Sequence, residues 1–380
     1  MDPQWSEEQV ELRRSLVDFA RKELNSDLRE LDGAEKFNRE DWVKCASQGV
    51  TGLPFPEKYG GGGKDPLTTI HALEGLGYGC RDNGLLFGMN AQMWACQAPL
   101  LQFGTEEQIE KYLPGLCAGQ LIGGHALSEP EAGSDAYNLS SIARREGDAY
   151  VLSGEKRFVT NGPAADVLII FAMTDPDKGK QGISAFLVES NTPGLEIRRV
   201  SKLGLRTAQM GDITLNECRI PASNRLGREG GGVSVFSHGM EWERAFILAP
   251  AVGTMERILE TCVDYARKRR QGGRAIGKYQ MIQERIVEMK MDLETSRALL
   301  YRTARLKAAG RSIHQEAAMT KLHISEAWLR TARHAMRIFG GRGYLTEHEI
   351  ERELRDAEGA VIYSGTSEIQ KLIIAGFMGL

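Results

Sequence analysis

The spacing of apolar residues changes twice along this chain. Up to about residue 120 they recur every three or four positions, which is the period of amphipathic helices. Short runs rich in branched residues, broken by Gly, Pro, Asp and Asn, then predict antiparallel strands, and the helical spacing returns beyond residue 232. We therefore predict an α+β fold with an N-terminal helical domain (1–120), a middle antiparallel β domain (121–232) and a C-terminal four-helix bundle (233–380).

Local signals refine this outline. Ser6, with a glutamine three residues later, predicts a capping box at the start of the first helix. The apolar stretch 85–101 predicts a helix that packs inside its domain. We expect Thr105 to open a short helix that ends before Gly115, and Pro250 to mark either the first turn of a long helix or a kink. The strongest strand signals cover residues 149–152, 165–173, 182–188 and 211–215.

Composition excludes several classes of protein. A chain of 380 residues with 42% apolar content is long enough for a large buried core. A net charge of −3 argues against general binding to nucleic acid or to an anionic membrane surface. No apolar run reaches the roughly 20 residues that span a bilayer, and the start of the chain does not resemble a secretory signal. Six widely spaced cysteines predict reduced thiols without a metal site, and hence a cytoplasmic protein.

Two groups of motifs carry the functional signal. One is the run Ala126–Asp135, and the other combines Arg342–Tyr344, Arg355–Asp356 and Gly365–Ser367. In this order, and over nearly the whole chain, they resemble the two signatures of the acyl-CoA dehydrogenase family. The resemblance implies FAD as cofactor and α,β-dehydrogenation of an acyl thioester. It also implies electron transfer to an electron-transferring flavoprotein or to oxygen, and a homo-oligomer that we expect to be a tetramer.

The resemblance also suggests cofactor contacts. Hydroxyls and backbone amides around Ser128 and Ser134 would bind the flavin ring and the pyrophosphate, and Phe158 would form an aromatic wall where tryptophan is more usual. Without the resemblance, these segments would be read as a polar turn and a core strand. The arginine-rich and glycine-rich segments at 269–277 and 337–343 resemble those that reach the FAD of a neighbouring subunit, although each could be a solvated helix end. The expected cofactor-binding residues are Leu127, Ser128, Gly133, Ser134, Phe158, Thr160, Arg269, Gln271, Gln280, Arg337, Gly340, Gly341, Thr366 and Glu368.

One residue departs from the family's pattern in a way that matters for catalysis. Ser364 stands where the catalytic glutamate is usual, and a serine without an activating partner cannot take a proton from carbon at neutral pH. Some members of the family carry the base at or near the start of the first C-terminal helix, and alignment on Arg244 places Glu243 at that position. The ordinary explanation of Glu243 is a solvated carboxylate in a first helical turn. Glu241 is the second candidate, but it should face elsewhere.

The resemblance assigns the remaining site residues. The backbone amide of Ser364 would polarise the thioester carbonyl as part of an oxyanion hole. Arg244 would support Glu243, and Trp242 would help to desolvate its carboxyl group and so raise its pKa. The expected substrate contacts are Trp242, Tyr363 and Gly365.

The sequence leaves the substrate open. Trp242 to Arg244, together with Ser364, resemble a subgroup of the family that oxidises prolyl groups tethered to a peptidyl carrier protein in natural-product pathways. A short- or branched-chain acyl-CoA dehydrogenase would need the same base and would differ only in the carrier of its thioester. A flavin monooxygenase or N-hydroxylase on the same fold would explain the serine but would leave Glu243 without a role.

Overall fold

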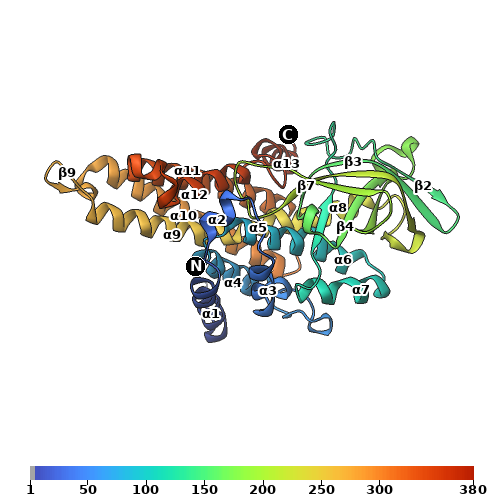
Figure 1. Cartoon of the computed structure of the whole chain (residues 1–380), viewed down its shortest axis with the longest axis horizontal. Helices are drawn as coiled ribbons and strands as arrows, with labels where there is room; N and C mark the ends of the chain where they lie inside the picture. Colours follow the sequence, from blue (N-terminus) through green and yellow to red (C-terminus); the bar gives the residue numbers. More distant parts are fainter. Residues whose placement is uncertain (1–4) are drawn as a thin grey trace.

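The computed structural model describes residues 5–380. An elongated helical bundle extends to one side of the molecule and a sheet lies at the other side, with the N-terminal helices packed beneath their junction in the view of Figure 1. The prediction that the chain starts without a secretory signal falls largely on residues 1–4, outside the described range. No helix within residues 5–380 is both long enough and apolar enough to cross a membrane.

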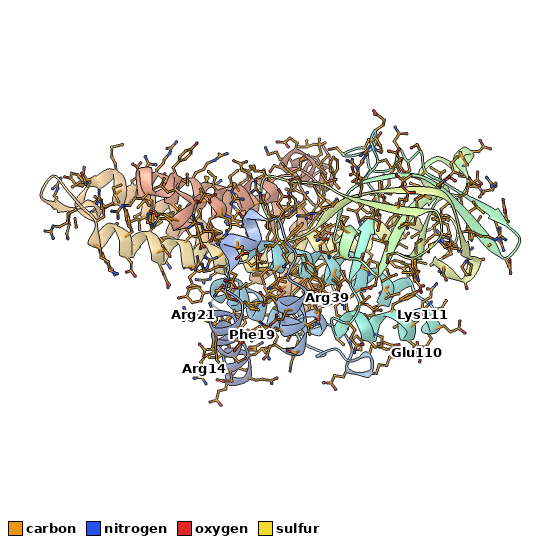
Figure 2. The ribbon with its side chains drawn as sticks, viewed as in Figure 1. Arg14, Phe19, Arg21, Arg39, Glu110 and Lys111 are labelled. Atoms are coloured by element: carbon orange, nitrogen blue, oxygen red, sulfur yellow. The ribbon has the colours of Figure 1, made fainter. Side chains whose placement is uncertain are left out.

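The N-terminal region consists of short helices. The predicted capping box at Ser6 is confirmed, because the Gln9 amide donates to Ser6 Oγ at 3.2 Å and the Ser6 amide donates to Gln9 Oε1 at 3.0 Å. The charged side chains of Arg14 and Lys111 lie on the outside of this region (Figure 2). Its helices are α1 (Glu7–Glu23), α2 (Leu28–Gly33), α3 (Arg39–Ser47), α4 (Pro66–Gly79), α5 (Asn83–Ala91), α6 (Ala98–Phe103) and α7 (Glu106–Cys117).

The last of these helices differs from its prediction. Thr105 does cap α7, but the helix does not end before Gly115: it continues through Pro114 to Cys117. A proline and a glycine are tolerated here because the buried residues Tyr112, Leu113 and Leu116 bring tertiary packing that outweighs weak helical propensity. The apolar stretch 85–101 is buried as predicted, and Gln92–Gln97 within it form a π-helical segment between α5 and α6.

The middle region is a sheet of eight strands. Their order is β6-β7-β3-β2-β4-β5-β8, with β1 beside β4. Most pairs are antiparallel as predicted, whereas β4 pairs in parallel with β1 and, through one residue pair, with β2. Four strands match the strongest sequence signals (β3, β4, β5 and β7), and four shorter ones have weak signals. The strands are β1 (Gly123–Ala126), β2 (Ile142–Glu146), β3 (Ala149–Thr160), β4 (Val167–Met173), β5 (Ile183–Glu189), β6 (Leu195–Arg199), β7 (Met210–Pro221) and β8 (Arg225–Leu226).

The C-terminal region is helical again. Pro250 lies in the first turn of α9, where its missing N–H breaks no hydrogen bond. Helix α9 packs against α10 and α11, and also against α4 of the N-terminal region. A Cβ on Gly253 would lie 1.9 Å from the Glu74 carbonyl oxygen, so only glycine allows α4 and α9 to approach this closely. The elements are α8 (Gly232–Phe246), α9 (Ala249–Lys268), β9 (Arg270–Gln271), β10 (Arg274–Ala275), α10 (Gln280–Ala308), α11 (His314–Phe339), α12 (Ile350–Ala360) and α13 (Ser367–Phe377).

Candidate active site

Glu243 and Ser364, which are far apart in the sequence, meet in the structure. Ser364 Oγ donates a hydrogen bond to Glu243 Oε1. Glu243 is 8% exposed, so it is not the solvated carboxylate that its ordinary explanation requires. The prediction that it lies near the start of its helix is wrong. Helix α8 begins earlier, at Gly232, because residues from Gly232 onward pack against β5, and Glu243 therefore lies in the last turn.

The environment of Glu243 favours a protonatable carboxyl group near neutral pH. Burial raises its pKa to about 7, against the opposing influence of the Ser364 hydroxyl and the positive charges of Arg244 and Lys321. A carboxylate with a pKa close to the operating pH is a suitable base for removing a proton from carbon. Glu241 is different, since it accepts from Lys307 Nζ at 2.6 Å and from the Ile313 amide at 2.7 Å. Glu241 therefore anchors α8 and faces away from Ser364, as predicted.

The turn that follows α12 is held mainly through its carbonyl groups. The Ser364 carbonyl oxygen accepts from Arg244 Nε at 3.2 Å and from Gln370 Nε2 at 3.1 Å. The Gly365 carbonyl oxygen accepts from Gln370 Nε2 and from Lys321 Nζ, both at 2.8 Å. Ser364 itself has a φ of 57°, in the left-handed region. Within residues 5–380 the Ser364 amide makes no hydrogen bond, so it is available to a ligand.

Tyr363 and Trp242 occupy different surroundings. The Tyr363 ring packs on Phe87 at a centroid distance of 4.4 Å and lines a narrow cavity between the N-terminal helices and the bundle. Trp242 stacks on Trp94 at 5.7 Å, and Lys307 Nζ lies 4.6 Å from its ring centroid. Trp242 thus packs on a different side of α8 from the Glu243–Ser364 pair, and its part in substrate contact stays a prediction.

The loop after β1 presents free hydroxyl groups. The hydroxyls of Ser128, Ser134 and Thr160 make no hydrogen bond to another residue within the described part of the chain. A buried ion pair fixes this loop: Lys156 Nζ lies 2.6 Å from Glu129 Oε1 and also donates to the Leu127 carbonyl oxygen at 3.2 Å. Gly133 has no heavy atom within 4 Å of the place a Cβ would take. This donor set fits the carbonyl edge of a flavin ring and a phosphate group.

An exposed aromatic side chain lies on the same strand as Thr160. Phe158 is 64% exposed and has a φ of 57°, although it belongs to the long strand β3. Its ordinary explanation, a core aromatic residue, is therefore wrong. An exposed aromatic ring fits a planar cofactor that would cover it. At the start of α13, Thr366 caps the helix and Glu368 is exposed in the first turn.

The remaining predicted cofactor residues gather at the far end of the bundle. The β9–β10 hairpin after α9 carries Gln271 at one end of the molecule (Figure 1). The end of α11 returns to this region, because the ring of Phe339 stacks on Tyr265 at 4.0 Å. Arg269, Gln271, Gln280, Arg337, Gly340 and Gly341 are therefore separate from the Glu243 site within one chain.

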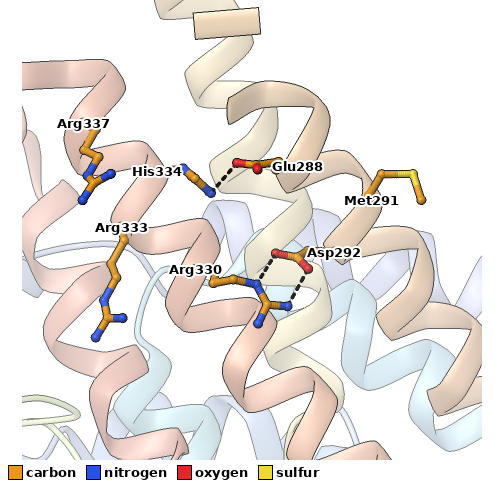
Figure 3. Close-up of a pocket in the computed structure, with 7 residues that line it drawn as sticks. All are labelled: Glu288, Met291, Asp292, Arg330, Arg333, His334 and Arg337. Carbon is orange, nitrogen blue, oxygen red and sulfur yellow. Dashed lines mark hydrogen bonds and ion pairs between the residues drawn. The ribbon is translucent and has the colours of Figure 1, made fainter. Parts of the chain in front are cut away.

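A charged groove of about 440 Å³ lies between α10 and α11 near this end (Figure 3). Asp292 pairs with Arg330 at 2.7 Å and Glu288 pairs with His334 at 3.0 Å. Arg337 lines the groove and has no ion-pair partner within residues 5–380. Its guanidinium group is thus free to meet an anion from another molecule.

Sequence reasoning missed two residues of the site. Lys321 and Gln370 are both buried and both donate to the Ser364–Gly365 turn. Lys321 had a usable signal: it follows Ala317 by four positions and precedes Trp328 by seven, which places a lysine on the apolar face of α11. A charged residue in that register needs a partner or a function.

Comparison with known families identifies the family of this chain. Models of the acyl-CoA dehydrogenase N-terminal, middle and C-terminal domains match residues 6–120, 124–218 and 230–379. The chain belongs to the acyl-CoA dehydrogenase family. It is therefore an FAD-dependent oxidoreductase that acts on acyl thioesters, and its three-part fold is that of the family.

Individual relatives cover the chain almost completely. An L-prolyl-[peptidyl-carrier protein] dehydrogenase of Pseudomonas fluorescens is 42% identical over 89% of this chain and 90% of its own. The crystal structure of the prolyl acyl carrier protein oxidase AnaB is 52% identical, with a TM-score of 0.98 over 99% of this chain and 100% of its own. The structure of PigA with FAD and proline is 39% identical, with a TM-score of 0.97 over the full length of both chains. Short-chain-specific acyl-CoA dehydrogenases are also relatives, at 37–38% identity.

Proposed function

We propose that this enzyme dehydrogenates a prolyl group that is carried as a thioester on a peptidyl carrier protein. The hydrogen bond between Ser364 and Glu243 is the observation that supports this most strongly, because it brings a buried carboxylate to the turn whose usual base is absent. The prolyl group and the carrier come from the relatives, which are prolyl-carrier-protein dehydrogenases and an oxidase by name. Conversion of a prolyl to a pyrrolyl thioester removes four hydrogen atoms, and so needs two successive two-electron oxidations.

In this proposal Glu243 is the base that removes the α-proton. Its carboxylate is oriented by the Ser364 hydroxyl and lies where water is largely excluded. Bound FAD would supply the acceptor for the β-hydride. Because its pKa is about 7, Glu243 can both hold this proton and release it near neutral pH.

The Ser364 amide would bind the thioester carbonyl oxygen. Arg244 and Gln370 hold the carbonyl oxygen of the same residue, and the fixed turn keeps the amide directed outward. A donor that is already in place stabilises the negative charge that develops on the carbonyl as the proton leaves. Tyr363, Gly365 and, less directly, Trp242 would then form the walls around the substrate.

We propose that FAD lies between the loop after β1 and the start of α13. Ser128, Ser134 and Thr160 provide the free hydroxyls, Phe158 provides the aromatic wall, and Thr366 begins a helix whose N-terminus favours negative charge. Leu127, Gly133 and Glu368 complete the residues that we assign to this part of the FAD site. A phosphate group and an isoalloxazine edge would satisfy these groups.

The distal residues require a second subunit in this proposal. Arg269, Gln271, Gln280 and Arg337 lie at the other end of the bundle, together with Gly340 and Gly341, so they would act on the FAD of a neighbouring chain. We therefore propose a homo-oligomer, a tetramer, whose subunits complete one another's cofactor sites. The domain limits 1–120, 121–232 and 233–380 are kept as part of the same proposal.

The acceptor and the cellular location complete the proposal. Oxygen is favoured as the electron acceptor, since AnaB is named an oxidase, with an electron-transferring flavoprotein as the alternative.

The six cysteines are free and buried, which supports a reducing, cytoplasmic location. No group of three metal-ligating side chains is present within residues 5–380.

One assay tests the substrate and the acceptor together. The FAD-loaded enzyme is mixed without oxygen with prolyl-carrier protein, with prolyl-CoA and with butyryl-CoA, and the flavin absorbance is followed. We expect rapid bleaching with the carrier-bound prolyl group alone, and hydrogen peroxide in step with product once oxygen is admitted. Faster bleaching by butyryl-CoA would instead assign a short-chain acyl-CoA dehydrogenase.

A further inference from the structure

Lys321 is a buried cation at the turn that forms the proposed oxyanion site. Its side chain is 0% exposed, and its ammonium group donates to the Gly365 carbonyl oxygen at 2.8 Å. No carboxylate within residues 5–380 lies within 4.0 Å of this ammonium group. A buried lysine without an ion-pair partner is costly to the fold, which suggests that its charge has a use.

The groups that face Lys321 come from four elements. Arg244 and Glu243 lie on α8, Tyr363 precedes the turn with its ring centroid 5.9 Å from the ammonium, and Glu326 and Glu368 lie on α11 and α13. Glu326 is already engaged by the Ser367 hydroxyl at 2.7 Å, and Glu368 is exposed. Among these carboxylates Glu243 is the buried one, and the positive charge of Lys321 lowers its pKa.

We propose that Lys321 is a positioning residue that fixes the Ser364–Gly365 turn through the Gly365 carbonyl and whose charge favours the carboxylate form of Glu243. This inference depends on the proposed function, in which Glu243 removes the proton and the Ser364 amide binds the carbonyl. Both effects favour catalysis. The hydrogen bond to the Gly365 carbonyl keeps the Ser364 amide in place, and the positive charge favours the deprotonated form of Glu243 that acts as the base.

The electrostatic part has a definite sign. The positive charge of Lys321 lowers the pKa of Glu243, while burial and Arg244 lower the pKa of Lys321 itself to about 7. Loss of the positive charge should therefore raise the pKa of Glu243. The acidic limb of the pH–rate profile, on which Glu243 becomes deprotonated, should then move to higher pH.

Three substitutions separate the two effects. Lys321→Met removes the charge and the hydrogen bond, Lys321→Gln keeps a donor without the charge, and Lys321→Arg keeps both. The control is Ser325→Ala, one turn further along α11, where within residues 5–380 a buried hydroxyl bonds only to its own helix, through the Leu322 carbonyl oxygen at 3.1 Å. FAD content is measured for every variant, followed by kcat and KM for prolyl-carrier protein from pH 5.5 to 9.

We expect Lys321→Met to lower kcat at least tenfold and to move the acidic limb upward by about half a pH unit or more, with FAD still bound. Lys321→Gln should show the same movement with a smaller loss of kcat, Ser325→Ala should keep the limb at the wild-type pH, and Lys321→Arg, whose charge persists throughout this pH range, should not move the limb upward. If Lys321→Met does not fold, the comparison of the Gln and Arg variants carries the test.

An acidic limb that stays in place in both neutral variants would overturn the inference and leave Lys321 a purely structural residue. Two measurements distinguish this result from failure of the proposed function. If the wild-type enzyme does not oxidise prolyl-carrier protein, the proposed function itself is wrong, and if Glu243→Gln keeps wild-type turnover, Glu243 is not the base. If the wild-type enzyme is active and Glu243→Gln is inactive while the limb of the neutral Lys321 variants is unmoved, only the inference about Lys321 is wrong.

Discussion

Replacement of Glu243 by glutamine tests the centre of the proposed mechanism. The amide keeps the shape of the side chain and can still accept from the Ser364 hydroxyl, but it cannot take a proton from carbon. A positioned general base contributes about 10²–10⁴-fold to a rate. We therefore expect kcat to fall by at least a hundredfold while FAD stays bound and KM changes little.

The same substitution should stabilise the protein at alkaline pH. The folded-state pKa of Glu243 is about 7 against an ordinary value of 4.5, so its contribution to stability is fully present below pH 4.5 and is lost as the pH rises through 7. This difference corresponds to about 3 kcal/mol, because one pKa unit is about 1.4 kcal/mol. Glutamine has no charge to bury. The free energy of unfolding of Glu243→Gln, relative to that of the wild type, should therefore be higher at pH 8.5 than at pH 5.

Both effects can be measured on the same preparations. Anaerobic bleaching of the flavin by prolyl-carrier protein gives the rate of the first oxidation, and urea unfolding at pH 5 and pH 8.5 gives the stability difference. Glu241→Gln, on the same helix as Glu243, is the matched control: it breaks an ion pair to Lys307 of α10 and should lower stability without a comparable loss of rate. Bleaching by Glu243→Gln within tenfold of wild type would refute Glu243 as the base.

Three further outcomes are expected. Ser364→Ala removes a hydrogen bond that favours the charged form of Glu243, so the acidic limb of kcat/KM against pH should move upward while FAD content stays constant. Phe158→Ala should weaken FAD binding by more than tenfold in an equilibrium titration, with little change in the unfolding midpoint of the apoprotein, because the ring is exposed without the cofactor. Arg269→Ala should lower both FAD content and the tetramer fraction in light scattering, and a monomer that still retains FAD would contradict shared cofactor sites.

The order of the regions and the long helices were predictable because they follow from repeated patterns. Strands β3, β4, β5 and β7 are rich in branched residues and stood out, whereas β2 exposes most of its residues and has little apolar signal. The end of α7 was predicted wrongly because Pro114 and Gly115 are overridden by burial of the neighbouring residues. The helix propensities of single residues do not include the effect of such tertiary contacts.

The candidate site was only partly predictable for a related reason. Motifs identified Glu243 and Ser364 one at a time, but no local pattern could show that they share a hydrogen bond across 121 positions. The predicted position of Glu243 in its helix was wrong because no residue in 227–232 signals that α8 already begins at Gly232. Lys321 was overlooked because a lysine is usually read as a surface residue, although its register places it among buried neighbours.

Moving the base from the turn to α8 changes what residue 364 has to do. When base and oxyanion donor belong to one residue, a single backbone geometry sets both. Here the donor amide lies on the turn and the carboxylate lies on a helix, so their relative position depends on contacts between the two elements. The Ser364 hydroxyl and Arg244 supply those contacts in opposite directions, one from the turn to Glu243 and one from α8 to the Ser364 carbonyl. A serine at this position is therefore better explained as a link between the two parts of the site than as a remnant of a lost base.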